Sequence, residues 1–205
     1  VSGVNLDGLF PSVPLIQDSA SGYLYGVTSS GGSNGTGVIF RMCPGGVELG
    51  CGASVSFEVL YNFSGLDQWF NNDSGAYPSG SLLLIEKEGD KWLYGVTRAG
   101  GKYSVIKKDL VNSVDLQRTG SGVIYKIRAD KFETVGSNPH DFQVVYDFSE
   151  LCVPFIVVEN NECTGKGSVG SVGAAPVQAL LKLPSGDLVG VTTVGAENGL
   201  GSIYK

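Results

Sequence analysis

The sequence predicts an all-β protein of about three four-stranded antiparallel, propeller-like blades, and three observations lead to this fold class. One segment recurs three times, as Leu-Tyr-Gly-Val-Thr at 24–28 and 93–97 and as Leu-Val-Gly-Val-Thr at 188–192. Glycine contributes 31 of the 205 residues, about twice its ordinary share, which suits short strands joined by tight turns. No stretch combines a sustained helical period with caps at both ends. Such internal repetition indicates one small unit that stacks on its own copies, because a single unit does not bury its apolar face alone.

Four strands are predicted in a unit, always in the same order. The first is an apolar run that begins with proline, at 11–16, 78–85 and 176–183. Turn residues such as Ser21-Gly22 separate this run from the Leu-Tyr-Gly-Val-Thr segment, as a β-hairpin requires. That segment is therefore the second strand.

The third strand begins at Gly37 and Gly122 as Gly-Val-Ile-(Phe or Tyr), and at Gly201 as Gly-Ser-Ile-Tyr. The fourth, at 57–64 and 142–149, alternates with period two and is rich in β-branched and aromatic residues. Aromatic residues recur at equivalent positions, and we expect them to form the core between blades: Tyr25, Tyr94, Phe40, Tyr125, Tyr204, Phe63 and Phe148.

The units form one continuous repeat domain. The first covers residues 1–64 and contains a loop between Cys43 and Cys51, and the second covers 65–149 with an insertion at 102–120. Residues 150–205 comprise an insertion with Cys152 and Cys163, followed by an incomplete third unit. Propellers have about four or more blades, so we expect an arrangement that is open or completed by oligomerisation, because unpaired strand edges are association sites.

The four cysteines lie in two local pairs, Cys43 with Cys51 and Cys152 with Cys163. Four cysteines allow three connectivities, and pairing within each loop is the simplest. We expect two disulfides and an oxidising compartment; the alternative is four reduced thiols in a cytosolic protein. A zinc site is disfavoured because neither pair has zinc-ligand spacing and His140 is the single histidine.

The formal net charge of −6 disfavours nucleic acid and anionic membrane surfaces as partners. No apolar run is long enough to insert into a membrane, and residues 1–10 lack the basic start and apolar centre of a signal peptide. We therefore expect a soluble chain, secreted to the extracellular space or the cell surface, from which any export signal has been removed.

The sequence gives no selective signal for catalysis. A Ser-His-Asp or Cys-His system would have to use His140, which stands beside Asp141. Carboxylates for glycoside hydrolysis are present, but their type and spacing select no pair among Asp67, Asp73, Glu150, Glu159 and Glu162. We predict a protein that is not an enzyme and needs no cofactor; calcium bound to oxygen ligands at 71–75 is the alternative to an ordinary turn there.

One loop has the composition of a ligand-binding site. Trp69 and Phe70 stand in the polar stretch 65–75 together with Asn71 and Asn72. An aromatic ring flanked by amides stacks on a sugar while the amides bond its hydroxyls, and it also anchors protein interfaces. These four residues are the predicted ligand-binding site; the alternative is a loop that folds its own tryptophan inward.

The repeated segments resemble the Gloeo/Verruco (GloVer) tandem repeat, which contains Leu-Tyr-Gly-Thr-Thr, a Gly-Gly pair and Gly-x-Gly-Thr-Val-Phe. The matching residues are Tyr61–Asp67, Leu93–Thr97 and Gly122–Tyr125, and the resemblance covers most of the chain outside its insertions. It implies an exported bacterial protein with an extracellular, propeller-like module and no assigned reaction. The chain departs from that pattern in its few repeats, its long insertions with cysteines, and Val189 in place of tyrosine.

Together these features favour a non-catalytic extracellular structural or interaction module that self-assembles through its open strand edges into an oligomer or a surface filament. Its expected partners are copies of itself. A glycan-binding, lectin-like module is the first alternative, and a secreted hydrolase is the second.

Overall fold

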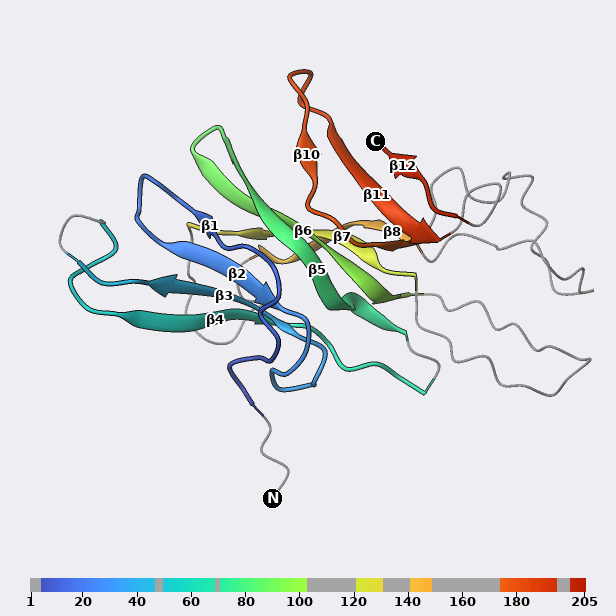
Figure 1. Cartoon of the computed structure of the whole chain (residues 1–205), viewed down its shortest axis with the longest axis horizontal. Coiled ribbons are helices and arrows are strands. Elements are labelled where there is room, and N and C mark those ends of the chain that lie inside the picture. The colour runs from blue at the N-terminus through green and yellow to red at the C-terminus, as the bar shows by residue number, and fades with distance from the viewer. Residues whose placement is uncertain are drawn as a thin grey trace, which may run out of the picture.

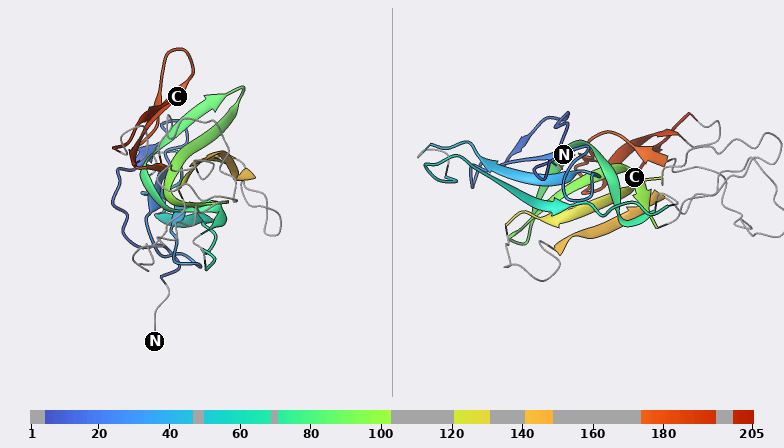
Figure 2. Two further views of the ribbon diagram at one scale, coloured as in Figure 1. Left: turned by 90° about the vertical axis from the view of Figure 1, so that its right-hand side faces the viewer. Right: turned by 90° about the horizontal axis from the view of Figure 1, so that it is seen from below.

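The computed structural model describes residues 5–46, 50–68, 71–102, 121–130, 141–148, 174–194 and 200–205. Within these ranges the chain has no α-helix, and its strands form three four-stranded antiparallel sheets (Figure 1). The predicted all-β class and the four-stranded antiparallel sheets are thereby confirmed. The sheets follow one another along the molecule, so that the second lies between the first and the third (Figures 1 and 2).

In the first and second sheets, strands that follow one another in the chain also lie side by side. The first sheet consists of β1 (Ile16–Gln17), β2 (Leu24–Thr28), β3 (Val38–Cys43) and β4 (Ser56–Asn62). The second consists of β5 (Asn72–Lys87), β6 (Asp90–Gly101), β7 (Val123–Arg128) and β8 (Gln143–Asp147). The third consists of β10 (Leu181–Lys182), β11 (Leu188–Val194) and β12 (Ile203–Tyr204), and β9 (Ala174–Pro176) also pairs with β11. β9 and β10 together occupy the place beside β11 that β5 has beside β6.

The first strands differ in length from the predicted apolar runs. β5 has 16 residues rather than the predicted 78–85, because its N-terminal half also pairs with β6. β1 has only 2 residues, since Pro11 and Pro14 lack the N–H groups that a strand ladder needs. Leu9 keeps an isolated bridge to Ser30, so the chain before β1 still follows the edge of β2.

Aromatic residues at equivalent positions of the sheets form the core between sheets, as expected, except Phe40, which is buried but belongs to neither inter-sheet cluster. One buried cluster lies between the first and second sheets and another between the second and third. Six of the seven aromatic side chains expected there are at most 7% exposed, and Tyr94 is half-buried against the second cluster. The six are Tyr25, Phe40, Tyr125, Tyr204, Phe63 and Phe148.

In every sheet a glycine lies directly opposite an aromatic residue of the next strand. The pairs are Gly26 with Phe40, Gly95 with Tyr125 and Gly190 with Tyr204. A Cβ atom on the glycine would lie 2.6, 2.3 and 2.2 Å, respectively, from that aromatic side chain. Because no larger residue leaves this space, glycine at the centre of the repeated segment lets the ring lie across the sheet.

A buried threonine joins two strands at the same place in every sheet. In the second sheet, Thr97 Oγ1 accepts a hydrogen bond from the Val123 N–H at 3.1 Å and donates one to the Ala99 carbonyl at 3.0 Å. Thr28 and Thr192 make the equivalent two bonds with their own neighbours, at 2.9 to 3.2 Å. The hydroxyl thus fixes the end of the second strand against the start of the third, and this accounts for the repeated Val-Thr.

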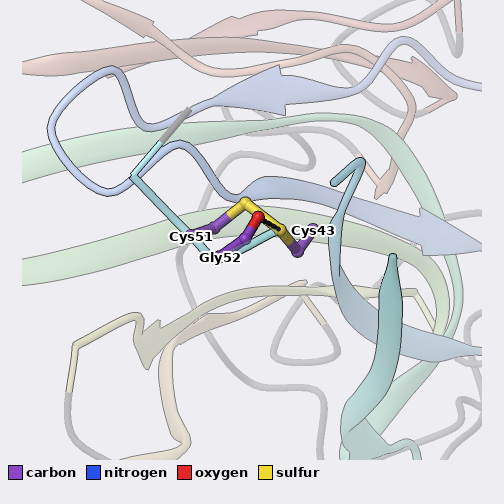
Figure 3. Close-up of a disulfide and its surroundings, with 3 residues drawn as sticks. All are labelled: Cys43, Cys51 and Gly52. Carbon is purple, nitrogen blue, oxygen red and sulfur yellow. Dashed lines mark hydrogen bonds between the residues drawn. A yellow bond between two sulfur atoms is a disulfide. The ribbon is translucent and has the colours of Figure 1, made fainter. Parts of the chain in front are cut away.

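Cys43 and Cys51 form a disulfide, as predicted, with Cα atoms 5.7 Å apart (Figure 3). Cys43 ends β3 and is fully buried, and the Gly52 carbonyl oxygen lies 3.5 Å from its sulfur. The bond closes the connection from β3 to β4. It lowers the conformational entropy of the unfolded chain and so stabilises the fold by about 2–3 kcal/mol. Cys152 and Cys163 lie outside the described residues, so their pairing stays a prediction.

We predict that Thr97→Val lowers the free energy of unfolding by about 2 kcal/mol, because it leaves the buried Val123 N–H and Ala99 carbonyl without their partner. Thr193→Val is the matched control: it removes an exposed hydroxyl of β11 whose bond to the Ala175 carbonyl, at 3.2 Å, is open to solvent, so it should change stability by less than about 0.5 kcal/mol. Urea unfolding followed by circular dichroism measures both. Equal effects of the two substitutions would contradict the role assigned to Thr97.

Candidate functional site

The second sheet is attached to the first by a backbone hydrogen bond that the third sheet repeats on the second. The Tyr77 N–H donates to the Thr36 carbonyl at 2.9 Å, and the Ala175 N–H donates to the Ser121 carbonyl at 2.8 Å. Tyr77 and Ala175 both precede a proline and both have positive φ, 57° and 53°. The same local conformation therefore aims an N–H group at the preceding sheet in both places. We call the interface around the first of these hydrogen bonds, between the first and second sheets, the first joint. The interface around the other, between the second and third sheets, is the second joint.

In each joint the proline lies against a glycine of the preceding sheet. A Cβ atom on Gly37 would lie 2.7 Å from Pro78 Cδ, and one on Gly122 would lie 2.9 Å from Pro176 Cδ. Both glycines have positive φ, 103° and 89°, and a Cβ there would also strike the carbonyl oxygen of the joint's threonine. The joint thus needs glycine in one sheet and proline in the next.

Apolar side chains fill both joints. The first contains Tyr25, Val27 and Ile39 of the first sheet and Leu82 and Tyr125 of the second. Tyr125 is 1% exposed, and this burial raises its pKa.

The second joint is also largely apolar. Val96, Phe148, Leu180 and Tyr204 form its buried cluster, and the rings of Phe148 and Tyr204 lie 5.1 Å apart. The Tyr204 hydroxyl is buried without a hydrogen-bond partner among the described residues, and burial raises its pKa to about 12. The centre of this joint is therefore buried and apolar apart from this hydroxyl.

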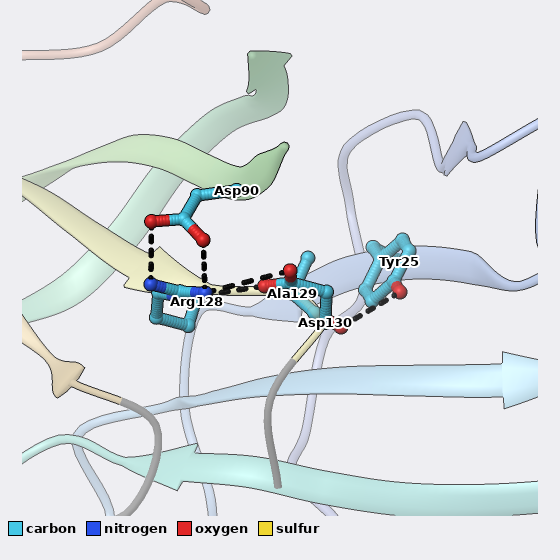
Figure 4. Close-up of polar contacts among 5 residues, drawn as sticks. All are labelled: Tyr25, Asp90, Arg128, Ala129 and Asp130. Atoms are coloured by element: carbon cyan, nitrogen blue, oxygen red, sulfur yellow. Dashed lines mark hydrogen bonds and ion pairs between the residues drawn. The ribbon is translucent and has the colours of Figure 1, made fainter. Parts of the chain in front are cut away.

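Polar groups cross the first joint at its rim. The Tyr25 hydroxyl donates to the Ala129 carbonyl at 3.3 Å, and Lys91 Nζ lies 2.6 Å from Asp18 Oδ2 (Figure 4 shows the Tyr25 contact). Arg128 holds the neighbouring turn of the second sheet by donating to both carboxylate oxygens of Asp90, at 2.8 and 2.6 Å (Figure 4). The Tyr25 and Lys91 contacts thus join the two sheets, while the Arg128–Asp90 pair lies within the second sheet.

The outer faces of the first and third sheets carry exposed counterparts of residues that the joints bury. Leu15 is 44% exposed, whereas its equivalents Leu82 and Leu180 are each 4% exposed. Ile203 is 74% exposed, whereas its equivalent Ile39 is fully buried. The outer face of the first sheet (Phe10, Leu15, Phe57) and that of the third (Leu181, Ile203) are therefore apolar surfaces with joint-forming residues but no sheet of the described chain upon them.

The predicted ligand-binding residues are only partly described. Trp69 and Phe70 lie outside the described residues. The Asn72 side chain bonds four backbone groups, donating to the Ser64 and Gly75 carbonyls and accepting from the Gly75 and Gly101 N–H groups at 2.7 to 3.2 Å. Asn71 donates its N–H to Asp67 at 2.8 Å, and its Oδ1 is buried without a partner among the described residues. Their role in ligand binding stays a prediction.

An open hollow of about 620 Å³ lies beside this loop, where the first and second sheets meet. The rings of Tyr61 and Phe142 stack at one side of it with centroids 3.9 Å apart. Burial raises the pKa of Tyr61, and contacts with Ser74 and Ser64 oppose that rise. The residues that line the hollow are Tyr61, Ser64, Asp73, Ser74, Lys102, Phe142, Gln143 and Val144.

The described ranges contain no group of three or more His, Cys, Asp or Glu side chains placed to hold a metal ion. The calcium alternative at 71–75 gains no support from the geometry, because the Asn72 amide oxygen is engaged by two N–H groups. His140 lies outside the described residues. No helix in the described part of the chain is long and apolar enough to cross a membrane.

Comparison of the chain with protein-family models, with curated proteins and with solved structures gives no match. Function is therefore inferred from the joints and the outer faces. Sequence reasoning did not identify the joints, although their signal is present. A proline begins each first apolar run and a glycine precedes each third strand, at Pro11, Pro78, Pro176, Gly37, Gly122 and Gly201.

The ion pair across the first joint predicts a specific loss of stability in acid. Burial alone would raise the pKa of Asp18, but hydrogen bonds from Lys91, Ser21 and the Ala20 N–H outweigh it, so this pKa lies below its usual value. Because the folded-state pKa is the lower one, the stabilisation is complete above the unfolded-state value of about 3.9 and is lost as the pH falls through the folded-state pKa.

We expect Asp18→Asn to lower the free energy of unfolding by about 2 kcal/mol near neutral pH, with the difference from wild type vanishing in acid. Asp7→Asn, at an exposed carboxylate, is the control and should follow the wild-type curve. Urea unfolding measured across the acid range tests this, and an Asp18→Asn effect that does not change with pH would contradict it.

Proposed function

We propose that this chain is a non-catalytic structural and interaction module of the extracellular space or cell surface, and that it assembles with copies of itself. Its three sheets would be propeller-like blades, stacked face to face. The observation that carries the proposal is that equivalent residues of the three sheets are buried inside the chain but exposed on its outer faces. Leu15 and Ile203 are exposed at the outer faces, while their equivalents are buried inside the joints.

An apolar face of this kind favours association. Burial of exposed apolar area stabilises a contact by roughly 25 cal/mol per Å² before the cost of association is subtracted, and unpaired sheet edges add backbone hydrogen bonds. Extended apolar patches on a protein surface also mark interaction sites more often than they mark inert surface. The aliphatic and aromatic residues on the outer face of the first sheet and the aliphatic residues on that of the third fit a partner of the same construction.

The Cys43–Cys51 disulfide is compatible with an exported protein. Disulfides form and persist in oxidising compartments, and they are rare in the cytosol. The disulfide also stiffens the loop next to the outer face of the first sheet, because β4 with Phe57 begins just after it. A rigid loop there lowers the entropy cost of forming a contact at that face.

We predict that the purified chain forms oligomers whose average mass rises with concentration in the micromolar range. Sedimentation velocity and light scattering over a dilution series measure this. A monomer that persists undiminished at the highest concentrations would contradict self-assembly, because both apolar faces would then remain in water.

Glycan binding is the alternative function, and the hollow beside the 65–75 loop favours it. The hollow combines stacked aromatic rings with hydroxyl, carboxylate and amine groups, which is the chemistry that carbohydrate sites use. Its volume, about 620 Å³, falls in the range of small-ligand sites.

For this alternative we expect signals on a glycan array that Trp69→Ala and Asp73→Asn each reduce about tenfold or more. Asp7→Asn, which changes a carboxylate outside the hollow, should leave any signal unchanged. Absence of binding by the wild-type chain, or full binding by both variants, would exclude a glycan site at this loop.

A further inference from the structure

We infer that copies of this chain associate head to tail: the outer face of the first sheet of one copy seats on the outer face of the third sheet of the next. This inference rests on the self-assembly proposed above, and it adds the two surfaces, their polarity and their contacts. The contact would be a third occurrence of the joint that the chain already makes twice. The first sheet has the residues that donate in a joint, and the third sheet has the residues that accept.

The donor half is present in the first sheet. Phe10 precedes Pro11 and has φ 57°, the same value as Tyr77 before Pro78. In both joints the residue at this position donates its N–H to the preceding sheet. The Phe10 side chain is 68% exposed, and its N–H has no acceptor among the described residues. The first sheet thus holds the strained donor conformation without the sheet that would receive the hydrogen bond.

The acceptor half is present in the third sheet. Gly201 has φ 97°, close to the values of Gly37 and Gly122, and a Cβ on it would lie 2.2 Å from the Thr192 carbonyl oxygen. The residue before this glycine supplies the accepting carbonyl in both joints, and at the third sheet that residue is Leu200. The head-to-tail contact therefore pairs the Phe10 N–H with the Leu200 carbonyl and places the Pro11 ring on Gly201.

The side chains of the two faces fit the same arrangement. In the second joint Leu180 lies in a cluster with Val96 and the half-buried Ile124. Leu15 is the equivalent of Leu180, and Val191 and Ile203 are the equivalents of Val96 and Ile124 in the third sheet. Contact between the two faces would bury these residues against one another in the same arrangement as their equivalents in the second joint.

A two-fold contact of either face with itself lacks these features. Two third sheets facing each other would bring together two accepting carbonyls and two glycines, with neither an N–H donor nor a proline ring to meet them. Two first sheets would oppose two donors and two prolines. Only unlike faces complete the joint, so the association is heterologous and leaves one donor face and one acceptor face at the ends of any open chain of copies.

The test uses one variant for each half. Leu15→Asp blocks the first-sheet face, and Ile203→Asp blocks the third-sheet face. Val145→Asp changes an exposed apolar residue on the edge strand of the second sheet and is the control. Phe10→Ser and Leu181→Asp form a second pair of variants, so the result does not depend on the folding of one protein. Circular dichroism and urea unfolding establish that each variant is folded, and sedimentation velocity measures mass.

We expect each face variant alone to associate at least about tenfold more weakly than wild type, and Val145→Asp to associate normally. An equimolar mixture of Leu15→Asp with Ile203→Asp should form dimers and nothing larger, because it contains one intact face of each kind. Two results with an oligomeric wild type would overturn the head-to-tail contact and leave self-assembly standing: a mixture that does not dimerise, or a single face variant that assembles as strongly as wild type. A monomeric wild type would overturn both.

Discussion

The sheets of this chain are apolar on both faces, and a sheet of that kind needs a covering layer on each side. In the first sheet, Tyr25 and Val27 point toward the second sheet, while Phe40 lies across Gly26 on the opposite face. The second sheet meets this requirement, since it has a neighbour on both sides. The first and third sheets have one neighbour each within the described chain. The stacking of the sheets, the burial of the repeated aromatic residues and the exposure of the outer faces all follow from this one constraint.

The joints show how such sheets are aligned as well as covered. A residue before proline is disfavoured in helical backbone conformations, and a non-glycine residue with positive φ costs roughly 1–3 kcal/mol. At Tyr77 and Ala175 this cost is offset by a hydrogen bond to the preceding sheet and by the packing of the following proline ring against a glycine of that sheet. Phe10 has the same conformation without that compensation, so its strain has already been incurred before any partner arrives. Such preorganisation lowers the cost of forming the contact.

The repeated segments predicted most of the strands and the all-β class, because alternation, turn residues and glycine content are local signals. The threonine of Val-Thr and the glycine opposite an aromatic residue were visible as repeats, but their bonds join strands and had to come from the structure. The joint was not predicted, since the left-handed conformation of Tyr77 runs against the preference of an aromatic residue before proline and is held by Thr36 in another sheet. At the predicted ligand site, the sequence indicated an amide available for sugars at Asn72, whereas the structure shows that amide bonded to four backbone groups.

A heterologous joint leads to a closed ring or to a filament, depending on the rotation from one sheet to the next. Both internal joints use the same backbone bond and the same proline–glycine contact, so a joint between copies would continue the same rotation. Closed propellers contain about four to eight blades. Two copies of this chain bring six sheets, a number within that range, whereas three copies exceed it. If the rotation matches a six-blade ring, assembly therefore ends at a dimer that covers both outer faces. A rotation that closes no ring leaves a donor face and an acceptor face exposed and lets copies add without limit.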